Sequence, residues 1–427
     1  QIVSMSVKVT NVGNTAGKDV VQLYVTAPYT ESYGIEKSTV SLVAFGKTDV
    51  IAPGGKDTVT MTFAKDDLTS YDYKTNECYV LDDGEYVFSL RSDSHDTITY
   101  DGEEQTLTWN NADRMIYNAE NDGARLSEKT AQGQLPDEEY VPATNAFDET
   151  MIESEMAKMT LLTRSDDFAV MPTEPTDADR VASDEMVAAA ARYDVTKHLN
   201  PDAEAPVTGA EKKLSLIDMR GLDADDPAWE DLLDQLTVDE MMNITLHNSY
   251  GESKALPSIG KPLSYEADGP TQIGSFNMPW HGTGFPNPTT IAQTWDKELA
   301  NAFGTQLGRE ADMLGYRGWY GPGCNLHRSP FGGRNAEYFS EDPFLSGKTA
   351  AAEIRGLQSR GVFAGIKHFA ANEQETHRSR NGDLSWLSEQ TLRELCLRPF
   401  EIAVKEAEAR ALMSSFNRIG TRWTGGD

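Results

Sequence analysis

Three short segments in the second half of the chain carry polar side chains that could hold a neutral, hydroxyl-rich ligand. They contain Asp268 in EADGP, Arg334 in SPFGGRNAEYF, and the adjacent pair Lys367 and His368 in GIKHFAANE. A carboxylate can accept hydrogen bonds from hydroxyl groups, whereas Arg, Lys and His can donate to hydroxyl oxygens. These residue types could therefore bind and orient an uncharged sugar.

A fourth segment, LMSSFNRIG, adds the apolar residues Met413 and Phe416. Apolar side chains can pack against the C–H faces of a sugar ring, so the whole set is typical of a monosaccharide pocket. A phosphate site would need more cations. An acyl-transfer site would need a Ser or Cys with a base, and the sequence contains no G-x-S-x-G motif.

Each of these residues also has a structural explanation, which the sequence leaves open. For the apolar pair it is the core, and for Asp268 it is an Asp-Gly-Pro turn after a strand. For the cationic residues it is an ion pair with a nearby acid: Arg334 with Glu337 or Glu341, and Lys367 or His368 with Glu373 or Glu375.

Strand-like and helix-like segments alternate over residues 224–427, and this alternation predicts a parallel sheet. The expected strands are residues 262–268, 318–325, 362–369 and 411–417, and the expected helices are residues 227–246, 290–315, 344–359 and 388–408. A doubly wound sheet and a (β/α)8 barrel both fit this pattern. DGPTQIGSF lacks the glycine spacing of a dinucleotide site. Polar residues follow several strands, and such strand ends converge at the mouth of a barrel, so we favour the barrel.

A complete barrel needs about 250 residues and eight strands. Only four clear strands are found in residues 224–427, and half a barrel would leave open parallel edges. We therefore expect a partial barrel, with the remaining strands supplied by further sequence or by another chain.

Two other parts precede this region. Residues 1–100 predict an all-β sandwich, because Val59, Met61 and Phe63 alternate with threonines and turn residues separate the strands. Residues 101–223 are acidic and show little periodicity, so we expect a linker that wraps the other domains.

The composition restricts the partners. The formal net charge of −30 disfavours nucleic acid and anionic membranes, and no segment is apolar enough to span a bilayer. The three cysteines have no disulfide or metal spacing, and neither do His368 and His377, so no metal or cofactor is expected. With no signal peptide in the sequence, we expect a cytoplasmic location, and the sequence leaves a homo-oligomer open.

Four motifs in order, EADGP, FGGRNAEYFSEDPFLSG, GIKHFAANEQETHR and LMSSFNRIG, resemble glycoside hydrolase family 3, the β-glucosidase and β-xylosidase group. They span about 150 residues, which makes the resemblance specific. VTNVGNTAGKDVVQLYV and LVAFGKTDVIAPGGKDTVTMTF resemble the fibronectin type III-like module of that family. This module usually follows the barrel and here precedes it, which resembles the permuted arrangement in which an α/β sandwich domain comes first. Both ends of the chain are then expected to be truncated.

The resemblance implies that Asp268, Arg334, Lys367 and His368 bind sugar hydroxyls in the −1 subsite, lined by Met413 and Phe416. Phe416 stands where many family members have Tyr. No catalytic residue is expected within the chain, because the family's nucleophilic Asp lies on a later barrel strand and its acid/base Glu in the sandwich domain. The KHFAANE segment lacks the KHFPGHG-type loop of a bacterial branch, so His368 is not the expected acid/base.

The sequence thus predicts part of a retaining glycoside hydrolase that releases β-linked glucose or xylose from short oligosaccharides. The alternative is a non-catalytic carbohydrate-binding fragment or scaffold, because the chain lacks both expected catalytic carboxylates.

Overall fold

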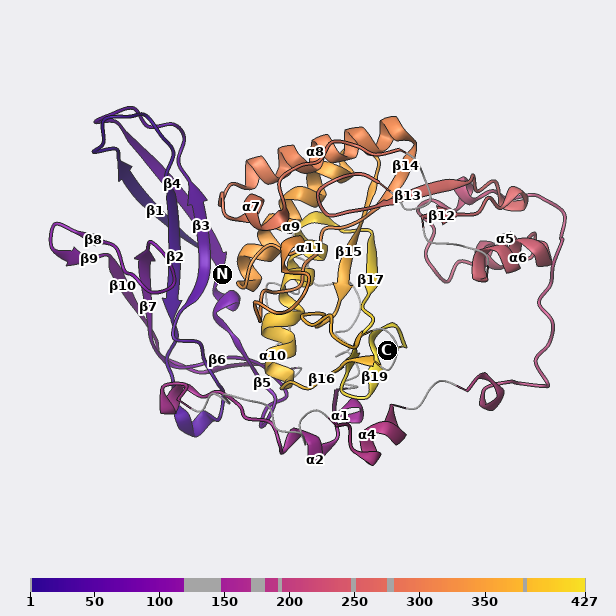
Figure 1. Cartoon of the computed structure of the whole chain (residues 1–427), viewed down its shortest axis with the longest axis horizontal. Coiled ribbons are helices and arrows are strands. Elements are labelled where there is room, and N and C mark those ends of the chain that lie inside the picture. The colour runs from indigo at the N-terminus through magenta and orange to yellow at the C-terminus, as the bar shows by residue number, and fades with distance from the viewer. Residues whose placement is uncertain are drawn as a thin grey trace.

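A computed structural model describes residues 2–118, 147–169, 181–190, 194–246, 251–274, 280–378 and 382–426. Figure 1 shows an all-β part on the left, coloured indigo, beside a mixed helix and strand part, coloured orange and yellow. Of the segment between these two parts, residues 147–169 and 181–190 lie at the bottom of the picture, and residues 194–246 extend to its right.

The amino-terminal part consists of antiparallel strands. One sheet has the order β10-β7-β2-β3, a second pairs β1 with β4, and a third has the order β11-β6-β5. The bounds are β1 Ile2–Thr10, β2 Val20–Thr26, β3 Ser41–Lys47, β4 Lys56–Ala64, β5 Ser70–Asp72, β6 Cys78–Leu81, β7 Gly84–Arg91, β8 Thr99–Tyr100, β9 Glu103–Glu104, β10 Thr106–Asn111 and β11 Met115–Tyr117.

The alternation expected in β4 is confirmed. Val59, Met61 and Phe63 are buried and the threonines between them are exposed. The buried residues pack in one core with Leu23 of β2 and Tyr86 of β7, so two sheets enclose this core as a β-sandwich. Strand pairing continues past residue 100, because β10 pairs with β7 and β11 pairs with β6.

The intervening segment contains short helices, α1 Phe147–Thr150, α2 Glu153–Met156 and α4 Asp184–Ala189. It contacts both larger parts. The Arg164 N–H donates to Glu36 of the β-sandwich at 2.9 Å, and the Thr421 N–H donates to the Thr150 carbonyl at 2.8 Å.

The carboxy-terminal part contains the expected parallel sheet. Its order is β12-β13-β14-β15-β17, and β13, β14, β15 and β17 run parallel while β12 is antiparallel to β13. The bounds are β12 Glu252–Ser253, β13 Ser264–Asp268, β14 Tyr316–Tyr320, β15 Phe363–Phe369 and β17 Ala411–Ser414. Three more short strands, β16 Leu384–Ser385, β18 Arg418–Ile419 and β19 Arg422–Trp423, form a separate sheet.

Helices α7 Pro288–Ala292, α8 Lys297–Leu314, α9 Pro343–Gln358 and α11 Arg398–Ala407 share a hydrophobic core with this sheet. The short helix α10 Glu389–Thr391 contacts β5 of the amino-terminal part. Helices α8 and α9 approach so closely that a Cβ added at Gly304 would lie 1.9 Å from the Glu353 carbonyl oxygen. The shared core includes Phe303, Leu307 and Ile366.

Three helices expected to be continuous are interrupted. The expected helix 227–246 is split into α5 Ala228–Leu233 and α6 Val238–Thr245, where the Thr237 hydroxyl accepts from the Glu240 N–H and begins a new helix. Asp296 caps α8 in the same way and separates it from α7. A π-helical turn over Leu392–Cys396 separates α10 from α11, which begins with Arg398 and Pro399.

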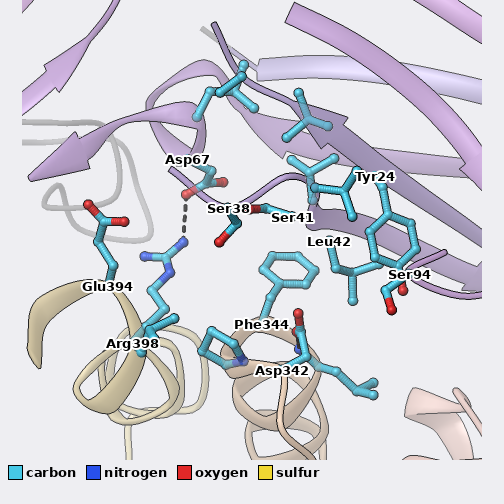
Figure 2. A pocket seen from close by; sticks show the side chains of 18 of the residues that line it. Tyr24, Ser38, Ser41, Leu42, Asp67, Ser94, Asp342, Phe344, Glu394 and Arg398 are labelled. Atoms are coloured by element: carbon cyan, nitrogen blue, oxygen red, sulfur yellow. Dashed lines mark hydrogen bonds and ion pairs between the residues drawn. The ribbon is translucent and has the colours of Figure 1, made fainter. Parts of the chain in front are cut away.

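A pocket of about 710 Å³ lies between the β-sandwich and the helices. Figure 2 shows Phe344 and Asp342 on one side and Tyr24, Ser41 and Leu42 on the other. Three of the acidic side chains that line this pocket already have protein partners. Asp67 pairs with Arg398 at 2.9 Å, Asp342 caps α9, and Glu394 accepts from the Tyr71 N–H at 2.5 Å. We therefore regard this pocket as a gap in the domain interface.

Candidate sugar-binding site

The candidate site lies at the carboxyl ends of β13 and β15. Strand β15 is buried along its middle, with Ala364 and Ile366 at 0% exposure, and its burial continues into Lys367 and His368. The Lys367 Nζ lies 2.9 Å from the Oδ1 atom of Asp268, the last residue of β13. Parallel strands bring their carboxyl ends to the same edge of a sheet, which explains how residues far apart in sequence meet here.

The two members of this ion pair differ in exposure. The Lys367 side chain is 3% exposed, whereas the Asp268 side chain is 28% exposed. The Asp268 Oδ1 also accepts a hydrogen bond from the Gly269 N–H at 2.7 Å. The carboxylate is thus held at the edge of the sheet with part of its surface accessible.

Arg334 lies in the loop after β14 and is held by two acids. Its guanidinium forms a close ion pair with Glu337 and lies 3.7 Å from the Oε1 atom of Glu375. Burial alone would lower the pKa of Arg334, but the neighbouring Glu337 and Glu375 raise it above its ordinary value. Of the two ion pairs considered from sequence for Arg334, the one with Glu337 is present.

His368 is fixed through its backbone and its ring. The side-chain oxygen of Asn325 accepts from the His368 N–H at 2.8 Å, and the Asn325 Nδ2 donates to the His368 carbonyl at 3.0 Å. The ring Nδ1 lies 3.1 Å from the Tyr338 hydroxyl. Burial, together with the positive charges of Arg334 and Lys367, lowers the pKa of His368 to about 2, so the ring is neutral at ordinary pH.

Phe416 stands at the margin of this cluster. The guanidinium of Arg378 lies 4.7 Å from the centre of the Phe416 ring, and Arg378 forms a close ion pair with Glu375. Phe416 is 58% exposed, so its other surface is open. Met413 is half-buried on β17, which pairs with β15.

A connected set of contacts therefore includes every sequence-predicted site residue except Met413. Asp268 pairs with Lys367, which is followed in the chain by His368, and the His368 Nδ1 lies 3.9 Å from the Oε1 atom of Glu337. Glu337 pairs with Arg334, which connects through Glu375 and Arg378 to Phe416. The position of Met413 is defined here only by the pairing of its strand.

Sequence reasoning missed several residues that hold this set together. Glu337 and Glu375 entered only as structural alternatives, and Tyr338 and Arg378 did not enter at all. The signal was present in the motifs GGRNAEYF and ANEQETHR, where acids and amides flank the selected cations. Their spacing does not reveal which acid meets which cation, because the two motifs are about 40 residues apart.

The residues of the candidate site offer hydrogen-bond donors and acceptors to a ligand. Within the described ranges, no group of three or more His, Cys, Asp or Glu side chains could hold a metal ion. None of the helices described is both long and apolar enough to cross a membrane.

Comparison with known proteins supports a carbohydrate-active family. Residues 240–425 match the glycosyl hydrolase family 3 N-terminal domain, and residues 19–94 match the fibronectin type III-like domain. The chain thus carries a glycosyl hydrolase family 3 domain. The resemblance drawn from the four sequence motifs is confirmed, and the fibronectin type III-like domain precedes the family 3 domain as expected.

Two curated relatives align with nearly all of this chain. Beta-glucosidase A of Butyrivibrio fibrisolvens is 31% identical over 439 residues, which cover 97% of this chain and 47% of the relative. A beta-glucosidase of Ruminococcus albus is 31% identical over 432 residues, which cover 99% of this chain and 41% of the relative. The chain therefore spans less than half the length of these two relatives.

A solved structure supports the arrangement of the fold. The crystal structure of a beta-glucosidase from Paenibacillus barengoltzii matches with a TM-score of 0.69 and 28% sequence identity. The match covers 99% of this chain and 43% of that chain. The β-sandwich and the parallel sheet thus occur together in a known β-glucosidase structure.

Proposed function

We propose that this chain supplies the −1 subsite of a retaining β-glucosidase of family 3. The observation that carries the proposal is the Asp268–Lys367 pair beside His368 and Arg334, at one edge of a parallel sheet. The partly exposed carboxylate accepts from sugar hydroxyls, and the cationic and imidazole groups donate to hydroxyl oxygens. Phe416 and Met413 cover an apolar face of the sugar ring.

In this proposal the chain positions the sugar and strengthens its hydrogen bonds in the transition state. Retaining hydrolysis needs a nucleophilic carboxylate and an acid/base carboxyl about 5–5.5 Å apart. The family resemblance assigns both to sequence outside residues 1–427. The sheet of β13, β14, β15 and β17 is then the first half of a (β/α)8 barrel.

The proposal extends to the division of the chain and to its partners. We propose a fibronectin type III-like module that reaches Tyr117, a connecting segment up to residue 223, and the barrel part from residue 224. The substrate is a β-linked glucoside, with xylose as the alternative glycone. A cytoplasmic location stays a prediction, supported by Cys78, Cys324 and Cys396 being free thiols.

Sugar binding is the direct test. We would titrate the 427-residue chain with glucose, xylose and galactose by calorimetry, and repeat this with Asp268→Ala. A hydrogen bond to a charged group contributes roughly 1.5–3 kcal/mol, so we expect Asp268→Ala to weaken glucose binding at least about tenfold. Asp312→Ala is the matched control, because Asp312 is an exposed carboxylate on α8 that pairs with Arg317 of β14. Equal binding by the Asp268→Ala variant would remove Asp268 from the site.

A non-catalytic carbohydrate-binding role is the second candidate. It is favoured by one observation: Asp268, Glu337 and Glu375 each have a cationic partner, so each is committed to an ion pair. Hydrolysis of an aryl β-glucoside separates the two candidates. The assay uses the chain alone, and then the chain mixed with the amino- and carboxy-terminal flanking regions of a relative as separate polypeptides. Activity only in the mixture supports the enzyme, whereas sugar binding without activity in either supports the binding fragment.

A further inference from the structure

A chain of hydrogen bonds leads from an acid on the site's rim to the ring of His368. The Asn372 Nδ2 lies 3.3 Å from the Glu375 Oε1 and 3.1 Å from the Tyr338 hydroxyl oxygen. That hydroxyl lies 3.1 Å from the His368 Nδ1. Tyr338, His368 and Asn372 are all buried, at 1%, 5% and 2% exposure, so water does not compete freely for these bonds.

The chemistry of Glu375 gives the chain a direction. Its carboxylate, held between Arg334 and Arg378, can only accept hydrogen bonds. The Asn372 side chain must therefore present its NH2 group to Glu375, because the opposite amide orientation would place an oxygen against a carboxylate. The same NH2 group then donates to the Tyr338 hydroxyl oxygen.

The Tyr338 hydroxyl has one proton to donate, and two acceptors are within reach. The His368 Nδ1 lies at 3.1 Å and the backbone carbonyl oxygen of Asn372 at 3.4 Å, so the shorter and better hydrogen bond goes to the histidine. Burial raises the pKa of Tyr338, so it keeps its proton. The low pKa of His368 keeps the ring neutral, so one of its two nitrogens has a lone pair, and the proton of the Tyr338 hydroxyl favours Nδ1 as that nitrogen.

We propose that Tyr338 is a positioning residue that holds His368 in the tautomer with its proton on Nε2, and that Asn372 and Glu375 orient Tyr338. The His368 Nε2 makes no hydrogen bond to any described residue. It is also absent from the set of unpartnered polar atoms that are fully buried, so it keeps some accessible surface. Nε2–H is therefore accessible as a hydrogen-bond donor. His368 then recognises the oxygen of a sugar hydroxyl by donating to it, and does not act as a general acid. The role in sugar recognition rests on the proposed function, whereas the tautomer does not.

The tautomer can be measured without any substrate. We would label the full chain with 15N-histidine and record two-bond 1H–15N correlations between pH 5 and 8, assigning His368 by the loss of its signals in His368→Gln. The expected pattern has a protonated Nε2 and a bare Nδ1 at every pH in this range. A protonated Nδ1 in the wild-type chain would overturn the proposal.

Two substitutions test the role of the hydroxyl. Tyr338→Phe removes the donor, and we expect protonation of Nδ1 to become populated, with the Glu337 Oε1 at 3.9 Å as the nearest carboxylate. Tyr316→Phe is the matched control, because the Tyr316 hydroxyl is also buried but has no hydrogen-bond partner among the described residues. An unchanged His368 pattern in a folded Tyr338→Phe variant would refute the positioning role.

A second variant keeps the tyrosine and reverses the direction of the chain. Asn372→Asp replaces the NH2 donor with an acceptor, so the Tyr338 hydroxyl should donate to Asp and accept from the His368 Nδ1–H. We expect the protonated nitrogen to switch from Nε2 to Nδ1, and the same tautomer as in wild type would contradict the proposal. If Tyr338→Phe does not fold, the His368 tautomer in Asn372→Asp still tests whether Tyr338 positions His368.

Sugar titration then separates the tautomer from the proposed function. If Tyr338→Phe changes the tautomer and weakens glucose binding about fivefold, as the loss of one neutral hydrogen bond predicts, both proposals are supported. If the tautomer changes and neither the wild-type chain nor the variant binds glucose, the positioning role stands and the proposed function fails.

Discussion

The two members of the Asp268–Lys367 pair should contribute unequally to stability, because they differ in burial. Removing Asp268 leaves the Lys367 ammonium 3% exposed and without this carboxylate. Removing Lys367 leaves a carboxylate that is 28% exposed and still accepts from the Gly269 N–H. The perturbations are Asp268→Ala, Lys367→Met and the double variant, all in the full chain.

The structure sets the expected magnitudes. Leaving a buried charge without its partner costs about 3–5 kcal/mol, so we expect Asp268→Ala to lower the free energy of unfolding by about 3 kcal/mol. For Lys367→Met we expect about 1 kcal/mol, because the remaining carboxylate is partly hydrated and methionine replaces most of the apolar stem. The double variant should be more stable than Asp268→Ala, because it no longer contains the buried charge.

The assay is urea unfolding at pH 7 followed by tryptophan fluorescence. Trp319 is a suitable reporter because its Nε1 donates to the Gly269 carbonyl, beside Asp268. Lys405→Met is the control, because the Lys405–Glu401 pair at 3.0 Å has a lysine that is 37% exposed, and it should change stability by less than about 0.5 kcal/mol.

The reasoning is wrong if Lys367→Met costs more than Asp268→Ala. It is also wrong if the double variant is as unstable as Asp268→Ala, since the cost would then not come from the ammonium left in the interior. If Asp268→Ala and Lys367→Met each lowered the free energy of unfolding by no more than Lys405→Met, the Asp268–Lys367 pair would be solvated in solution.

Three further predictions concern other parts of the chain. Glu353 is fully buried, its carboxyl oxygens have no hydrogen-bond partner among the described residues, and burial raises its pKa well above the ordinary value. The unfolded chain releases this proton above about pH 4.3 and the folded chain does not, so this residue lowers stability as pH rises. We therefore expect Glu353→Met to unfold like wild type at pH 4 and to be about 2 kcal/mol more stable at pH 7; parallel stability curves would contradict this. Arg398→Met should lower the free energy of unfolding by about 1–3 kcal/mol, because Arg398 links α11 to Asp67 and both side chains are only 17% exposed. The same change should speed amide hydrogen exchange at Tyr71. Unchanged exchange would mean that the contact between the domains does not depend on this ion pair. Tyr316→Phe should leave stability unchanged or raise it by about 1 kcal/mol, as measured by urea unfolding, because the hydroxyl it removes is buried without a partner among the described residues; a loss above 1 kcal/mol would reveal a hydrogen bond to that hydroxyl.

Local patterns were enough to predict most of the secondary structure. The period of two in β4 and the alternation of strands with helices both follow from which side chains must face a core. The same patterns failed at the interruptions in the helices. Thr237 and Asp296 cap new helices there. Hydrophobic periodicity alone does not reveal such a cap, because the apolar stripe continues past it.

The sequence by itself determined the family, the order of its two recognised domains, and the residue types available at the strand ends. It did so because EADGP, GGRNAEYF and KHFAANE are short motifs in a fixed order. Only the tertiary structure decided which of these residues meet. Asp268 and Lys367 are 99 residues apart in the chain, and their contact depends on β13 and β15 both pairing in parallel with β14, which lies between them. The hydrogen bonds from Glu375 through Asn372 and Tyr338 to His368 likewise join separate loops, and their direction follows from donor and acceptor geometry that a sequence does not contain.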